Sequence, residues 1–154
     1  MKYLTAFIVL ITLSMPLMSA ESSKVIKMTD FDRSFEGFSV STGELIKLNP
    51  AEGSFPMEID FIFDMPSGLG MNNSELTDWF PGKAGIIDLG SVALDIVTEI
   101  PVEGFNPFLD PESMIPGHTY LILTADAENY GKIHILNFDI ESELLEFSWV
   151  YLDK

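Results

Sequence analysis

The two histidines, His118 and His134, are the side chains best suited to bind a metal ion or haem iron. If the hairpin between their strands turns about Glu128, cross-strand pairing places Ile122 opposite His134 and His118 near Phe138. Both rings then share one face of the sheet, about four residues or roughly 13 Å apart at 3.3 Å per residue. Because this separation is too large for one small ion, we predict no metal site and leave the cofactor unassigned.

If the same pairing continues across the next turn, histidine, tryptophan and tyrosine side chains, whose rings end in a polar group, lie on one face of the sheet. It sets His134 beside Trp149 and Lys132 beside Tyr151, and Tyr120 joins the same face. Such side chains combine apolar area with a polar tip, so this face is a candidate ligand-binding surface. Alternatively, one of the two largely apolar faces of the sheet is the sandwich core and the long loops cover the other. A one-residue bulge would exchange the two faces.

A second candidate is the aromatic pair Trp79 and Phe80. The pair lies between Asp78 and a Pro-Gly-Lys turn, inside a segment from Met65 to Gly85 that is rich in Gly, Pro, Asn and Ser. Binding residues concentrate on loops of rigid β-scaffolds, so the pair could contact a ligand. Alternatively, both rings fold back as a lid over an apolar sheet face.

Other motifs that could carry chemistry are incomplete. The run Gly37–Ser41 lacks the second glycine of a nucleophile elbow. The loop that begins at Asp126 has the acids and glycine of an EF-hand start, but Tyr130 and Asn137 replace ligands, so we predict a hairpin loop. Asn72 heads a formal N-glycosylation sequence, relevant only in a eukaryotic secretory pathway.

Carboxylates are abundant, with 24 Asp and Glu against 8 Lys and Arg and a formal net charge of -16. This charge repels polyanions, which excludes nucleic acid as a partner. Glu58, Asp60 and Asp64 alternate with apolar residues, a pattern typical of the solvated face of a strand. The chain has no cysteine, which excludes disulfides, thiolate chemistry and cysteine-based metal sites.

The first twenty residues have the plan of a secretory signal peptide. Lys2 precedes an apolar stretch from Tyr3 to Leu13, and the segment ends with small residues, of which Ala20 is the last. The stretch is about half of the roughly 20 residues that a membrane-spanning helix needs. We therefore expect cleavage after Ala20, no integral membrane span afterwards, and a secreted, periplasmic or cell-surface protein. Residues 21–154 are expected to form a single β-rich domain, and the lack of disulfides suits a bacterial source.

Short strands separated by turn signals predict an all-β fold, an antiparallel β-sandwich or barrel with two long irregular loops, Met65–Gly85 and Pro101–Pro116. The strands are expected in three groups: a hairpin, three central strands, and a three-stranded meander at the end. Their ranges are 35–40 and 45–48 for the hairpin, 57–64, 86–89 and 92–100 for the centre, and 119–124, 132–139 and 144–152 for the meander.

In the order of its features, the sequence resembles the HmuY-like family of exported bacterial all-β proteins. The similar segments are Phe38–Glu44, Ile59–Phe63, Tyr120–Asp126, Tyr130–Ile133 and Leu145–Tyr151, about a third of the chain after the signal. Founding members of that family bind haem, so the resemblance implies the fold and a haem- or porphyrin-binding alternative.

The sequence also departs from the family pattern. A tryptophan-aspartate pair of the family appears here as Ile59-Asp60, and its asparagine- and glycine-rich segment appears as a looser Gly68–Asn73. No haem-ligand motif matches around His118 or His134, so no ligand residue is transferred.

Taken together, the incomplete motifs favour a non-enzymatic binding or cell-surface module over an enzyme. Its partner is expected to be a small molecule, a glycan or a surface protein. Carboxylate catalysis leaves no short sequence signature, so a glycan hydrolase remains a second alternative beside haem binding.

Overall fold

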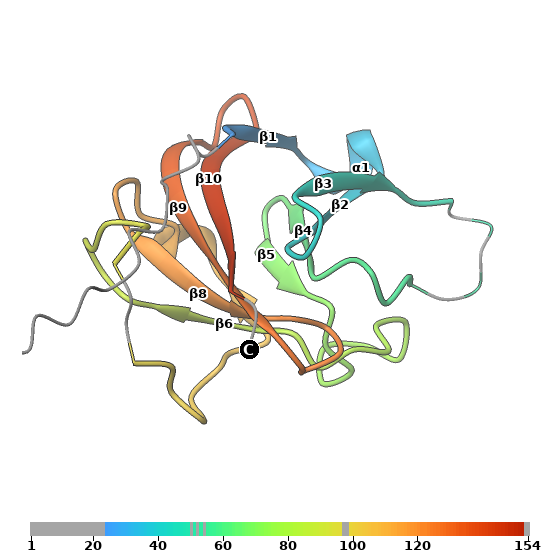
Figure 1. The fold of residues 1–154 in the computed structure, drawn as a ribbon. Coiled ribbons are helices and arrows are strands. Elements are labelled where there is room, and N and C mark those ends of the chain that lie inside the picture. Colours follow the sequence, from blue (N-terminus) through green and yellow to red (C-terminus); the bar gives the residue numbers. More distant parts are fainter. Residues whose placement is uncertain (1–23, 50, 52, 54, 97–98, 153–154) are drawn as a thin grey trace, which may run out of the picture.

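The computed structural model describes residues 24–49, 51, 53, 55–96 and 99–152, and the expected cleavage after Ala20 lies outside these ranges. Two antiparallel five-stranded sheets pack face to face as an open sandwich, with almost no helix (Figure 1). The predicted all-β class is therefore confirmed, and the sheets do not close into a barrel. No helix among the described residues is long and apolar enough to cross a membrane.

The first sheet, called sheet A, contains the predicted C-terminal meander. Its strand order is β1–β10–β9–β8–β6, and all its neighbouring strands are antiparallel. The strands are β1 (Ile26–Thr29), β6 (Gly85–Asp88), β8 (Thr119–Leu123), β9 (Tyr130–Asp139) and β10 (Leu144–Leu152).

The second sheet, called sheet B, contains the predicted hairpin and has the order β3–β2–β4–β5–β7. The hairpin turns at Gly43, whose φ of 69° favours glycine and whose missing side chain leaves room for the ring of Trp149. The strands are β2 (Glu36–Ser39), β3 (Glu44–Lys47), β4 (Phe61–Asp64), β5 (Gly68–Met71) and β7 (Phe108–Leu109); the short helices are α1 (Phe31–Ser34) and η1 (Pro111–Ser113).

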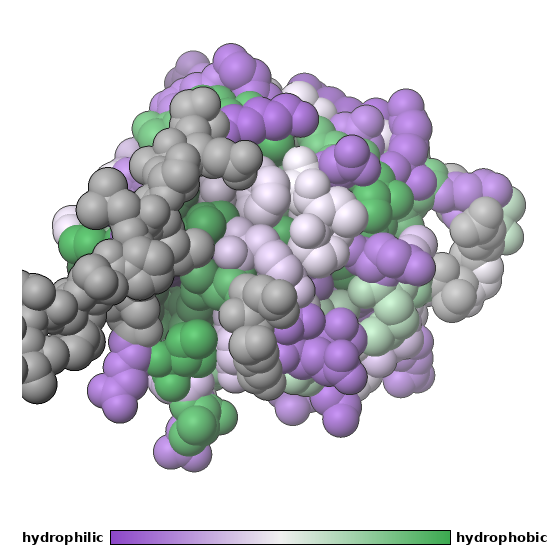
Figure 2. All heavy atoms as spheres, in the orientation of Figure 1, coloured by the Kyte–Doolittle hydropathy of each residue, from purple (hydrophilic) through white to green (hydrophobic). Residues whose placement is uncertain are grey.

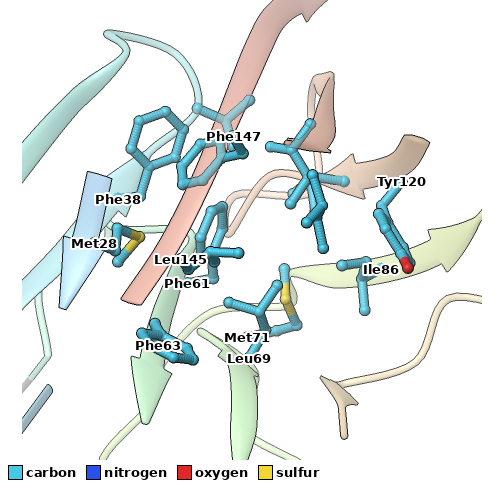
Figure 3. Close-up of a cluster of buried hydrophobic side chains, with 14 of the residues drawn as sticks. Met28, Phe38, Phe61, Phe63, Leu69, Met71, Ile86, Tyr120, Leu145 and Phe147 are labelled. Atoms are coloured by element: carbon cyan, nitrogen blue, oxygen red, sulfur yellow. The ribbon is translucent and has the colours of Figure 1, made fainter. Parts of the chain in front are cut away.

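The core lies between the sheets, where apolar side chains of both converge (Figure 3). Phe147 of β10 packs edge-on against Phe38 of β2, with ring centroids 5.0 Å apart. A second apolar cluster covers the outer face of sheet B and includes Phe55, Ile62 and Phe80. Strand β4 is therefore covered on both faces.

Some strands and loops were predicted at the wrong places in the sequence. The described part of the predicted strand 92–100 is irregular, and residues 97 and 98 lie outside the described residues. Conversely, β5 lies within the predicted loop Met65–Gly85, and β1 lies in a part of the chain where no strand was predicted. Two of the four residues of β5 are glycines, so its sequence resembles a loop although its backbone pairs with β4.

The predicted register of the β8–β9 hairpin is also wrong. Thr119, not Ile122, lies opposite His134, a shift of three residues. The turn is closed by the N–H of Ala127, which donates to the carbonyl of Thr124 at 2.8 Å, so it is centred earlier than Glu128. A shift by an odd number of residues reverses which side chains share a face.

Candidate functional site

The predicted aromatic face does not form as one surface. Tyr120, Trp149 and Tyr151 belong to the core side of sheet A, whereas His134 lies on its outer side. Tyr120 is fully buried: its hydroxyl donates to the carbonyl of Ser113 at 2.6 Å and accepts from the N–H of Ile115 at 2.9 Å. The structure thus places Tyr120 in the core and Trp149 and Tyr151 at its margin, partly buried.

The two histidines point to opposite sides of the sheet, contrary to the prediction. Thr119 is the partner of His134 and shares its outer face. His118, one residue earlier, lies on the other side of the strand, with its ring 6.3 Å from that of Tyr120. Its Nδ1 is 3.0 Å from Oδ2 of Asp88.

The hydrogen bonds around His134 fix the tautomer of its ring. The Thr119 hydroxyl donates its one hydrogen to the carbonyl of Val92 at 2.6 Å. It must therefore accept from Nδ1–H of His134, 2.8 Å away. The neutral ring then carries its lone pair on Nε2.

The segment from Val92 to Ile96, which was predicted as part of a strand, is irregular and covers part of the outer face of sheet A. Besides the Thr119 bond to Val92, Lys132 Nζ donates to the carbonyl of Ile96. Lys132 is buried, which lowers its pKa, and the charge of Asp95 opposes this effect. The segment is thus held to the sheet by side chains that reach its carbonyls.

The aromatic pair Trp79 and Phe80 covers the outer face of sheet B. Phe80 is only 6% exposed, and its ring lies 4.7 Å from that of Phe55 in an edge-on contact. Trp79 is partly buried and lies 5.0 Å from the same ring. This packing supports the lid interpretation of the pair.

We therefore expect Trp79→Ala to destabilise the protein by about 3 kcal/mol, the lower end for loss of a packed aromatic ring, because Trp79 is only partly buried. Thermal unfolding would measure the effect. Leu76→Ala, in the same segment but exposed, is the control and should leave the melting temperature nearly unchanged. An unchanged melting temperature for Trp79→Ala, together with altered ligand binding, would instead support a binding role.

A shallow hollow of about 240 Å³ lies where the β8–β9 hairpin meets sheet B. Its wall is rich in hydrogen-bond acceptors and comes from three separate segments of the chain. The lining residues are Ser41, Met57, Glu58, Asp60, Thr124, Asp126 and Asn129.

Asp60 lies at the bottom of this hollow, and its hydrogen bonds connect segments of the chain on different sides of it. One carboxylate oxygen accepts from the N–H of Val40 and the other from the N–H of Ala125, both at 2.7 Å. Burial raises the pKa of Asp60 from 3.8 to about 6, although the two hydrogen bonds lower it; the charge of Asp126 adds to the rise.

The prediction that Asp60 lies on a solvated strand face is wrong, since it is only 3% exposed. The reason is that the segment from Ile59 to Phe63 is buried at every position. A buried carboxylate requires hydrogen-bond partners, and those of Asp60 come from distant parts of the sequence. The alternation of apolar and acidic residues in the sequence did not indicate these hydrogen-bond partners.

Asn72 fixes the rim of the hollow. Its amide nitrogen donates to the carbonyls of Pro56 and Ile59 at 3.1 and 2.8 Å, and its oxygen accepts from the N–H of Gly82 at 3.0 Å. These bonds hold the turn that carries Glu58. Because Asn72 is fully buried and both amide hydrogens are used, it is unsuited to glycosylation.

The fold and this hollow define an all-β sandwich protein with a small, acceptor-rich surface site. In the described part of the chain, no group of three or more His, Asp or Glu side chains is arranged to hold a metal ion. No protein-family model matches the sequence, and no curated protein matches it.

Proposed function

We propose that this protein is an exported, non-enzymatic binding module that holds a hydroxyl-rich ligand, the end of a glycan, in the hollow above Asp60. The observation that carries the proposal is the lining: carboxylate, amide and hydroxyl groups from three segments converge on one small space. Such acceptors match the donors of sugar hydroxyls, and Met57 offers apolar area beside them. Export is supported by the signal-like first twenty residues.

The size and charge of the hollow limit the kinds of ligand that can bind in it. A volume of about 240 Å³ is below the range of about 300–1,000 Å³ for drug-sized ligands, so it suits one sugar ring. Glu58 and Asp126 on its wall, together with the net charge of -16, disfavour anionic ligands. A neutral sugar therefore fits better than an acidic one.

Binding is favoured over glycan hydrolysis because two of the three carboxylates that line the hollow, Asp60 and Asp126, already accept hydrogen bonds within the protein. A hydrolase needs two carboxylates directed at the scissile bond. Asp60 is nearly inaccessible and both of its oxygens accept backbone N–H groups, so its contacts support the fold.

The haem-binding alternative draws support from His134, whose hydrogen bond to Thr119 uses Nδ1 and leaves Nε2 as the nitrogen that could ligate iron. His118 lies on the other side of the sheet, so the two histidines do not form a pair of axial ligands. Haemin titration provides the test: a saturable Soret shift that His134→Ala abolishes would favour haem over a glycan.

Titration calorimetry against a panel of neutral and acidic oligosaccharides tests the proposal. We expect a neutral glycan to bind, and the double variant Glu58→Gln, Asp126→Asn to weaken binding about tenfold or more, through loss of charge-assisted hydrogen bonds. Asn retains the Oδ1 that accepts from Thr124 and Glu128, so the fold should persist. Glu75→Gln with Asp78→Asn, both exposed, is the charge-matched control.

Two outcomes would contradict the proposal. One is the absence of binding to every glycan of the panel. The other is release of a shorter sugar product, which would establish hydrolysis.

A further inference from the structure

Strands β1 and β3 leave two sheet edges open on the same side of the sandwich. β1 is the last strand of sheet A and β3 the last strand of sheet B, and both lie at the top of Figure 1. A groove of about 500 Å³ lies between them and is lined by residues 24–27 and 43–45. At the opposite end of sheet A, the edge of β6 is covered, because Asn106 exchanges two backbone hydrogen bonds with Ile86.

The hydrogen-bond pattern of the β2–β3 hairpin shows which main-chain groups of β3 point outward. The N–H of Leu48 donates to the carbonyl of Phe35 at 2.7 Å, in register with the hairpin. Hydrogen-bonded and non-hydrogen-bonded pairs alternate in an antiparallel ladder. Ile46 therefore also bonds to β2, whereas the N–H and C=O groups of Leu45 and Lys47 point away from it. A further strand can pair with β3 through these two residues.

The side chains of β3 offer apolar area to such a strand on both faces of sheet B. Leu45 packs on the core between the sheets and lines the groove, and Ile46 packs on the apolar cluster of the outer face. Both side chains are only partly buried, and Val25, on the other wall of the groove, is 49% exposed. Pairing at this edge removes apolar area from water.

The charge of this open side favours a second copy of the same chain as the partner. The chain has 24 acidic and 8 basic residues, so two copies repel each other over most of their surface. In β1, β3 and the groove, all of which the structure describes, one acid stands beside three lysines: Glu44 with Lys24, Lys27 and Lys47. Basic residues still outnumber acidic ones when Glu146, the ion-pair partner of Lys27, is included. Two copies therefore approach each other with the least repulsion at this side.

We propose that the protein forms a twofold-symmetric dimer in which β3 pairs antiparallel with β3 of a second copy. Leu45 of each copy lies opposite Lys47 of the other, so four N–H···O=C bonds form and sheet B becomes a ten-stranded sheet. In this register the twofold axis passes between the two Ile46 side chains, which meet on the outer face. The antiparallel order also brings Glu44 of each strand to the end of the other strand that carries Lys47. This inference does not depend on the glycan proposal.

Sedimentation equilibrium over a range of protein concentrations, at about 0.05 M and about 0.5 M NaCl, tests the proposal. We expect the measured mass to rise with concentration from that of one chain towards that of two. Because salt screens the repulsion between two acidic copies, the dissociation constant should fall about threefold or more at the higher salt concentration. Amide hydrogen exchange at Leu45 and Lys47 should be slower in the dimer than in the monomer.

Lys47→Pro tests the pairing itself, because proline removes the outward N–H and leaves the bonds between β3 and β2 in place. The dimer loses two hydrogen bonds, one for each copy, so the dissociation constant should rise about tenfold or more. Lys47→Ala is the matched control, because it keeps the N–H and removes only an exposed side chain. Its dissociation constant should stay within about threefold of that of the parent protein.

Three results would overturn the proposal. They are the mass of one chain at every concentration and at both salt concentrations, a dimer in which the amides of Leu45 and Lys47 exchange as fast as in the monomer, and unchanged dimerisation of Lys47→Pro. If thermal unfolding shows that Lys47→Pro does not fold, the hydrogen-exchange measurement on the parent protein decides.

Discussion

Replacing Phe147 by alanine is expected to lower the free energy of unfolding by about 3–5 kcal/mol, a large share of the 5–15 kcal/mol that holds a typical domain together. Phe147 is fully buried and lies beside Phe38 in the core (Figure 3). Its ring packs against Phe38, 5.0 Å away, and Phe61, 5.9 Å away. Because both neighbours belong to sheet B, the change leaves a cavity between the sheets and weakens their attachment.

Urea denaturation followed by tryptophan fluorescence would measure this loss. Ile140→Ala, at an exposed turn position, is the control and should change stability by less than about 0.5 kcal/mol. A loss below about 1 kcal/mol for Phe147→Ala would show that the two sheets do not depend on this contact.

The local pattern of the sequence predicted much of the sandwich. Strands β8, β9 and β10 lie within about two residues of the predicted ranges, and so do β2 and β3. In each of these segments, apolar or β-branched residues recur between clear turn signals. The glycine-rich β5 escaped prediction because its pairing with β4, rather than its own composition, makes it a strand.

The faces of sheet A could not be predicted, because they depend on single residues in turns and bulges. A bulge between Glu146 and Phe147 shifts the β9–β10 register, so Ile133, not His134, lies opposite Trp149. The turn near Ala127, whose φ is 60°, shifts the β8–β9 register as well. Either shift leaves the hydrophobic pattern intact, and together they separate His134 from the aromatic side chains predicted beside it.

The hollow depends even more on distant contacts. Asp60 accepts hydrogen bonds from Val40, which is 20 residues away in the sequence, and from Ala125, which is 65 residues away. No local sequence pattern indicates these hydrogen bonds, because they form only when the two sheets pack together. The acids of the β8–β9 loop were visible in the sequence, but Glu58 and Asp60 could be joined to them only once the fold was known.

The buried carboxylate of Asp60 should make the protein less stable as the pH rises from about 4 to about 6.5. The pKa of Asp60 is about 6 in the folded protein and has its ordinary value of 3.8 when the chain unfolds. Between these values the folded state binds more protons than the unfolded state, so raising the pH favours unfolding. A difference of about two pKa units corresponds to about 3 kcal/mol, present at low pH and lost above about pH 6.

Asp60→Asn removes this titration and should flatten the pH dependence of stability across the same interval. The variant is also expected to be less stable by about 1–3 kcal/mol at low pH, because its amide NH₂ group faces one of the two backbone N–H donors. Urea denaturation at pH 4.5, 5.5, 6.5 and 7.5 would measure both effects. Asp78→Asn, which removes the same charge at an exposed position, should keep the slope of the parent protein. If Asp60→Asn also keeps that slope, the pH dependence arises from the general repulsion among the 24 acidic residues, and Asp60 is not its source.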